Sequence, residues 1–190
     1  EKIFENFLGY VALFTPVQSH FLTDIYKRYH CLDSANIVLY FAKKTHQAIL
    51  RKKEYDLNYD LSFEKFWYNH SVTHIENLTI LDIAKNSNLP KETARRKIKE
   101  LTEQKVFTKL KKNISWMPND EYKKFYNKNI IEEIKQLAKL TKYVTDIINL
   151  NFSIEEITDE YKKKFSFYWF HYLDLQLKWM KLWKNQVSDL

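Results

Sequence analysis

The sequence predicts a mainly helical fold in which a short two-stranded β-hairpin lies near the middle of the chain, flanked by N- and C-terminal helices. Its 190 residues include one glycine and three prolines. A sandwich, a barrel or a doubly wound sheet needs many more turn residues, so we expect helices to dominate. A hydrophobic content of 45% is enough for a core. Alternating apolar residues over 106–117 predict the hairpin.

The first thirty residues predict two helices. Residues 3–14 are strongly apolar, and an apolar spacing of four residues resumes over 17–30. Pro16 lies between these segments and is expected to separate them, because its ring removes a backbone donor and clashes with the preceding turn.

Further helices are expected up to residue 76. Asp33 or Ser34 can cap the next one, which carries apolar residues at helical spacing. Residues 55–61 predict a connector. Ser62 can begin another helix, which is expected to end at about Glu76.

The central segment predicts a short helix, a tight turn and a second helix. Thr79, followed three residues later by Asp82, fits a capping signature at the start of the short helix. After the turn, Pro90 occupies a position where the first turn of a helix tolerates a missing amide donor. This second helix is expected to run to about Lys105.

A hairpin is expected to follow directly. We expect its inward side chains to be Val106, Thr108 and Leu110 on the first strand, with Ile114 and Trp116 on the returning strand. The turn would consist of Lys111, Lys112 and Asn113. Asparagine is the residue there that best tolerates the left-handed backbone which glycine normally supplies.

The C-terminal part predicts two helices. Asn119 or Asp120 can cap a long one of roughly 120–150, and Ser153 with Glu156 forms a capping box for the last.

That last helix is apolar around most of its circumference. Its polar residues are expected on one narrow stripe, formed by Ser166, His171, Asp174, Lys178, Lys181 and Asn185. Large side chains repeat at near-heptad spacing at Trp169, Leu173, Leu177, Met180 and Trp183. Such a helix must be covered by several neighbours or by a second subunit. The sequence therefore favours core packing or a homodimer seam.

The positive charge is concentrated in one segment. The formal net charge is +7, from 31 basic and 24 acidic residues. Between residues 85 and 112 lie ten basic and three acidic residues, and subtracting them from the totals leaves 21 of each sign elsewhere. A localised basic patch indicates a polyanionic partner, because neutralised phosphates release condensed counterions.

The order of elements over residues 78–118 resembles the winged helix-turn-helix domain of bacterial transcription regulators, of the MarR-like or GntR-like type. This resemblance implies a small core formed by Ile83, Ala84, Leu89, Ala94, Ile98 and Leu101. Two positions that often carry glycine in such domains are Asn88, in the turn, and Lys105, after the second helix. Lysine is the less comfortable of the two in a left-handed conformation, so a local difference is expected there.

The resemblance also implies a partner and a mode of binding. The helix of about 90–104 would lie in the major groove of duplex DNA, and the wing of 106–117 would contact the flanking backbone. The candidate base-reading residues are Arg95, Arg96 and Lys99, and the candidate phosphate contacts are Lys91, Thr93, Lys109, Lys111 and Lys112. The expected function is sequence-specific transcriptional regulation by a homodimer. The alternatives are a protein-interaction module and a non-specific, chromosome-organising DNA binder. The resemblance also implies an alternative role for the apolar last helix, as the lining of a pocket for a small apolar effector.

The predicted organisation therefore comprises an N-terminal helical region (residues 1–76), a winged helix-turn-helix DNA-binding domain (residues 77–118) and a C-terminal helical region that dimerises (residues 119–190).

No pattern in the sequence indicates catalysis, a cofactor or a metal. His70 and His74 are spaced for one helix face, but no third ligand accompanies them. The single cysteine, Cys31, excludes an internal disulfide and agrees with a reducing, cytoplasmic location. The expected DNA binding would associate the protein with the nucleoid. The apolar run 7–14 is too short to span a membrane.

Overall fold

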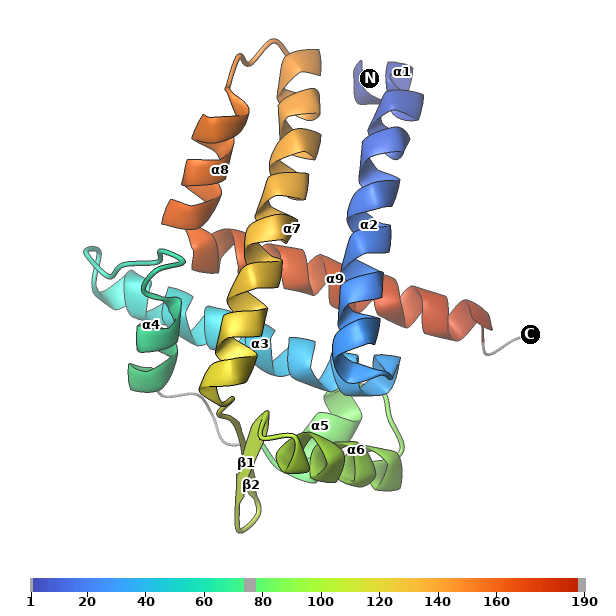
Figure 1. Ribbon diagram of the computed structural model, residues 1–190, viewed down its shortest axis with the longest axis vertical. Helices are drawn as coiled ribbons and strands as arrows, with labels where there is room; N and C mark the ends of the chain where they lie inside the picture. The colour runs from blue at the N-terminus through green and yellow to red at the C-terminus, as the bar shows by residue number, and fades with distance from the viewer. Residues whose placement is uncertain (1, 74–77, 188–190) are drawn as a thin grey trace.

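The computed structural model describes residues 2–73 and 78–187, and it is mainly helical with one small antiparallel sheet (Figure 1). In chain order the elements are α1 (Lys2–Glu5), α2 (Phe7–Tyr29), α3 (Leu32–Tyr55), α4 (Phe66–Val72), α5 (Ile80–Asn86), α6 (Lys91–Glu103), β1 (Phe107–Leu110), β2 (Asn113–Trp116), α7 (Asp120–Ile147), α8 (Ile154–Lys163) and α9 (Phe165–Val187). Within these ranges no helix has both the length and the apolar character needed to cross a lipid bilayer.

The helices form two crossing pairs. Helices α2 and α7 run side by side, and α3 packs along α9 across them (Figure 1). Helices α5 and α6 and the hairpin lie together at the end of the molecule away from the α7–α8 connection. Buried side chains from α2 to α9 form one hydrophobic core, which extends into the helix-turn-helix segment.

The prediction that Pro16 separates two helices is wrong, because α2 continues through it. Pro16 itself is exposed, whereas Val17, Phe21 and Ile25 form a buried stripe at four-residue spacing. Fully burying each such side chain contributes about 1.5–3 kcal/mol, which together exceeds the cost of about 3 kcal/mol for a proline inside a helix.

The one glycine of the chain lies where α2 approaches α7. A Cβ added at Gly9 would come within 1.9 Å of the Tyr143 hydroxyl oxygen. That hydroxyl donates a hydrogen bond to the backbone oxygen of Asn6, at 3.2 Å. A larger residue at position 9 would therefore displace the tyrosine from this contact.

The starts of α3 and α4 differ from expectation. Helix α3 begins at Leu32, after Cys31 at the N-cap position, so neither Asp33 nor Ser34 caps it. Helix α4 begins at Phe66, not at Ser62, because the backbone amide of Phe63 bonds to the Lys162 oxygen at 2.8 Å and holds this part of the chain in turns.

The expected single C-terminal helix is two helices, separated at Lys164. The capping box of Ser153 and Glu156 opens α8 as predicted. At the break, the amide of Ser166 donates to the Leu61 oxygen at 3.0 Å. The connector between α3 and α4 thus pairs with both sides of the break, and this long-range contact sets where the chain changes direction.

The predicted polar stripe of α9 is also partly wrong. Ser166 is fully buried, on the same side as Trp169 and Leu173, whereas His171 and Lys178 are exposed. Trp183, which was expected in the apolar seam with Trp169, is half exposed. The packing of α9 against α3 in the core therefore explains the first half of the apolar seam that was predicted along α9.

Candidate nucleic-acid interface

Helix α5 starts and stops at residues that the sequence identified. The Thr79 side chain accepts from the Asp82 amide at 3.3 Å, and the Asp82 carboxylate accepts from the Thr79 amide at 2.9 Å. At the other end Asn88 has a φ of 51°. The amide of Leu89 bonds to the Ala84 oxygen at 2.9 Å, which closes a Schellman-type turn. The capping box and the asparagine turn are therefore confirmed.

The burial expected for the inner side chains of α5, α6 and the turn between them is also confirmed. Every side chain predicted for the small core is buried, namely Ile83, Ala84, Leu89, Ala94, Ile98 and Leu101. Pro90 occupies the N-cap position of α6, one residue before its expected place, and this leaves Lys91 as the first helical residue.

Helix α6 ends two residues earlier than expected, in a second turn of the same type. Lys105 has a φ of 58°, and the amide of Val106 bonds to the Leu101 oxygen at 2.9 Å. Val106 and Leu101 are both buried, as is usual for the apolar contact of a Schellman motif. A lysine thus occupies the left-handed position that glycine fills most easily.

The hairpin forms where it was expected, but with a different face and turn. Phe107 is buried opposite Trp116, whereas Thr108 is exposed, so the inward position expected for Thr108 is wrong. Val106, Ile114 and Trp116 are buried as expected. In the turn, Lys111 rather than Asn113 takes the positive φ, at 57°. The reason is the register, which places Asn113 in β2 opposite Leu110 and leaves Lys111 in the turn.

Two contacts that the sequence did not predict hold the hairpin. The amide of Ile114 bonds to the Leu78 oxygen at 3.0 Å and forms an isolated antiparallel bridge. The Trp116 ring packs against Trp67, His70 and Tyr126, with centroids at 5.4, 5.3 and 5.9 Å. No alternation of apolar residues before Thr79 signalled the bridge. Through Trp116 the hairpin is anchored in the main core.

The predicted contact residues lie together at one end of the molecule, on α6 and the hairpin (Figure 1). Seven of them are exposed: Lys91, Arg95, Arg96, Lys99, Lys109, Lys111 and Lys112. The eighth, Thr93, is half-buried. Helix α6 therefore has an apolar inner face and a charged outer face.

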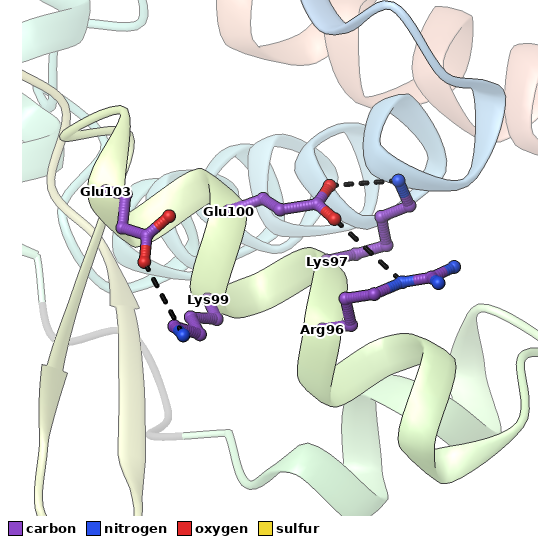
Figure 2. Close-up of polar contacts among 5 residues, drawn as sticks. All are labelled: Arg96, Lys97, Lys99, Glu100 and Glu103. Atoms are coloured by element: carbon purple, nitrogen blue, oxygen red, sulfur yellow. Dashed lines mark hydrogen bonds and ion pairs between the residues drawn. The ribbon is translucent and has the colours of Figure 1, made fainter.

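Ion pairs neutralise the outer face of α6. Arg95 Nη1 lies 3.3 Å from Glu92 Oε2. Arg96 Nε lies 3.9 Å from Glu100 Oε1, and Lys99 Nζ lies 3.8 Å from Glu103 Oε1. Both contacts are drawn as dashed lines in Figure 2. All three pairs join residues three or four positions apart and are largely exposed, so each contributes only a few tenths of a kcal/mol.

Lys97 differs from the other cations of α6. Its side chain is 15% exposed, and its Nζ donates to Glu100 Oε2 at 2.9 Å (Figure 2). This hydrogen bond raises the pKa of Lys97, desolvation opposes the rise, and the neighbouring Cys31 thiol adds to it. Both residues lie on α6, and Lys97 also lies beside Cys31, the N-cap residue of α3.

The hairpin carries positive charge without compensation. Within the described ranges no carboxylate forms an ion pair with Lys109, Lys111 or Lys112. The segment's excess positive charge is thus displaced from α6 toward the hairpin, a distribution that residue counts alone do not reveal.

The other residues considered as ligands do not form a site. His70 is buried against Trp116, and its sequence partner His74 lies outside the described residues. Among residues 2–73 and 78–187, no three His, Cys, Asp or Glu side chains gather closely enough to hold a metal ion. Cys31 is half-buried and free.

Comparison of the chain with protein-family models, with curated proteins and with solved structures gave no match.

Proposed function

We propose that residues 78–118 form a winged helix-turn-helix that binds duplex DNA, and that the protein acts as a transcriptional regulator. Helix α6 would enter the major groove, which is wide enough for an α-helix, and the hairpin would act as the wing along the flanking backbone. The observation that carries the proposal is the two-faced character of α6: its apolar side chains are all buried in the core, whereas Arg95 and Arg96 are exposed, and the lysine-bearing hairpin follows the helix directly in the chain.

The roles of the side chains follow from their chemistry. Arg95 and Arg96 can each present two parallel donors from two nitrogens to a guanine edge, whereas Lys99 donates from a single nitrogen. Lys91 is exposed at the N-terminus of α6, where the helix dipole also favours a phosphate. The unpaired hairpin lysines would supply affinity that depends on salt and not on sequence.

A second copy of the chain is part of the proposal. A homodimer would place two α6 helices about one turn of DNA apart and read a pseudo-palindrome. The exposed part of α9, which includes Leu175, Leu182 and Trp183, supplies apolar surface for such an interface. An apolar effector remains a prediction.

Fluorescence anisotropy tests the proposal. The probes are a duplex enriched from a random library by selection on this protein and a shuffled duplex of the same composition. We expect preference for the selected duplex and, for Arg95→Ala with Arg96→Ala, a loss of at least tenfold in affinity for it. The control, Lys135→Ala with Lys139→Ala on α7, removes the same charge away from the interface.

Three outcomes would contradict the proposal. Absence of duplex binding at low salt would favour a protein-interaction module. Equal affinity for both duplexes would favour a non-specific binder. An equal loss in the two double variants would place the contact elsewhere.

A further inference from the structure

We propose that Glu100 is a positioning residue that makes the interface selective for base sequence over bare phosphate charge. The inference rests on the proposed DNA-binding function and concerns how the same surface distinguishes a specific DNA sequence from the phosphate backbone alone. Its basis is that one carboxylate serves two cations of α6, Lys97 on its inner side and Arg96 on its outer side (Figure 2).

On the outer face of α6 three cations are paired with three carboxylates, one of which, Glu100, also serves Lys97. Arg95, Arg96 and Lys99 each have a glutamate partner on the same helix, at 3.3–3.9 Å. A phosphate that approaches one of these cations therefore also approaches a carboxylate. Lys91 and the hairpin lysines have no carboxylate partner among the described residues. They offer a phosphate the same attraction without that repulsion, so these lysines, and not the paired cations of α6, are the favoured sites for the DNA backbone.

Glu100 is held more firmly than the other two glutamates. Its Oε2 accepts the hydrogen bond from the largely buried Lys97, and its Oε1 is left facing the Arg96 guanidinium. Glu92 and Glu103 are each paired with one exposed cation and are themselves 73% and 65% exposed. The anchored carboxylate offers the exposed Arg96 guanidinium a partner of fixed position at 3.9 Å and so biases the direction in which it extends, whereas a mobile carboxylate would not.

A base edge and a phosphate respond differently to this arrangement. Guanine presents two neutral acceptors, so it can accept the donors of Arg96 without being repelled by Glu100. A phosphate bound to Arg96 would lie on the order of 7 Å from the carboxylate, and like charges at that distance in water repel enough to weaken binding about threefold. The Glu100 carboxylate therefore weakens the affinity of non-specific complexes more than that of specific ones.

The experiment compares Glu100→Gln with Glu103→Gln on the full chain, with the selected and shuffled duplexes at one salt concentration. Both variants remove one negative charge from α6, but only the first removes the charge shared by Lys97 and Arg96. We expect Glu100→Gln to raise affinity for the shuffled duplex about threefold and to leave or lower that for the selected one. Glu103→Gln should raise both alike.

A second variant keeps the inference testable if Glu100→Gln unfolds. Arg96→Lys retains the charge and loses the planar group that Glu100 orients, so selectivity should fall without a gain in affinity for the shuffled duplex. The inference is overturned if Glu100→Gln raises both affinities equally, or if Arg96→Lys leaves the ratio of affinities unchanged. Failure of the wild-type protein to bind either duplex would instead overturn the proposed function.

Discussion

The imidazole ring of His46 lies almost parallel to the phenyl ring of Phe66, with 4.7 Å between centroids and 19° between planes. His46 is fully buried, and neither of its ring nitrogens has a hydrogen-bond partner. Burial lowers its pKa to about 3, and the neighbouring His70 adds to the effect. The fold therefore requires this histidine to be neutral.

We predict that acid destabilises the protein through His46 and His70. Burial lowers the pKa of His70 to about 4, although a hydrogen bond to the Trp116 backbone opposes the shift. Both folded-state values lie below the ordinary 6.5, so the stabilisation is complete above pH 6.5 and is lost as the pH falls toward 4. Each histidine costs up to about 1.4 kcal/mol per pH unit in that window.

Urea titrations followed by circular dichroism from pH 7.5 to 4.5 measure this loss. His46→Leu should reduce the pH dependence of the unfolding free energy by up to about 1.4 kcal/mol per unit and remain folded at pH 7.5. An unchanged pH dependence in this variant would contradict the prediction.

Glu133 should change the unfolding free energy with pH in the opposite direction to the two histidines. It is buried on α7, and burial raises its pKa to about 7 against the lowering effect of Arg28. Its folded-state pKa exceeds the ordinary 4.5, so its contribution is favourable below pH 4.5 and is lost as the pH rises through 7. Glu133→Gln should therefore raise the unfolding free energy at pH 8 by about 1–3 kcal/mol. The same urea titrations check this, and a lower stability at pH 8 would refute it.

Local patterns in the sequence were enough to predict the parts of the site that adjacent residues determine. Thr79 with Asp82, Asn88 in the turn and Ser153 with Glu156 each act within four residues, and all three have their expected roles. The inward face of α6 follows equally from helical spacing. The DNA-binding role given to its outer face stays a prediction.

Contacts between distant segments determine the features of the fold and the site that local patterns did not predict. The break at Lys164 depends on Leu61, and the hairpin face depends on the pocket that receives Trp116. Neither partner can be identified from spacing within its own segment. The pairing of Arg96 with Glu100 was visible as a four-residue spacing, but the burial of Lys97 that anchors this carboxylate was not.

The continuous α2 helix gives a prediction about Pro16. This residue is exposed inside a helix that is held by the buried stripe beginning at Val17. Pro16→Ala restores a backbone donor and removes the clash with the preceding turn, so we expect the unfolding free energy to rise by about 1–3 kcal/mol. Thermal denaturation measures the change, with the equally exposed Ala12→Ser as a control expected to have little effect. A lower melting temperature for Pro16→Ala would show that the proline shapes the helix.

Lys105 gives a second prediction about stability. It holds a φ of 58° at the end of α6, where an L-residue with a Cβ is strained. Lys105→Gly should raise the unfolding free energy by about 0.5–1 kcal/mol, because glycine adopts this conformation without steric cost. Lys105→Ala removes the same charge and keeps the Cβ, so it should give no such gain. Equal effects of the two substitutions would point to charge, and not to backbone strain.

The unpaired hairpin lysines give a prediction about salt. If Lys109, Lys111 and Lys112 each contact one phosphate, neutralising them should reduce the slope of log affinity against log salt by about 2.7, at 0.9 per contact. Lys109→Gln, Lys111→Asn and Lys112→Gln keep the hairpin intact, because asparagine tolerates the positive φ at 111. Three exposed lysines of α7 and α8 changed to glutamine are the control: Lys135, Lys139 and Lys163. A slope that falls equally in both triple variants would mean that the hairpin makes no phosphate contact of its own.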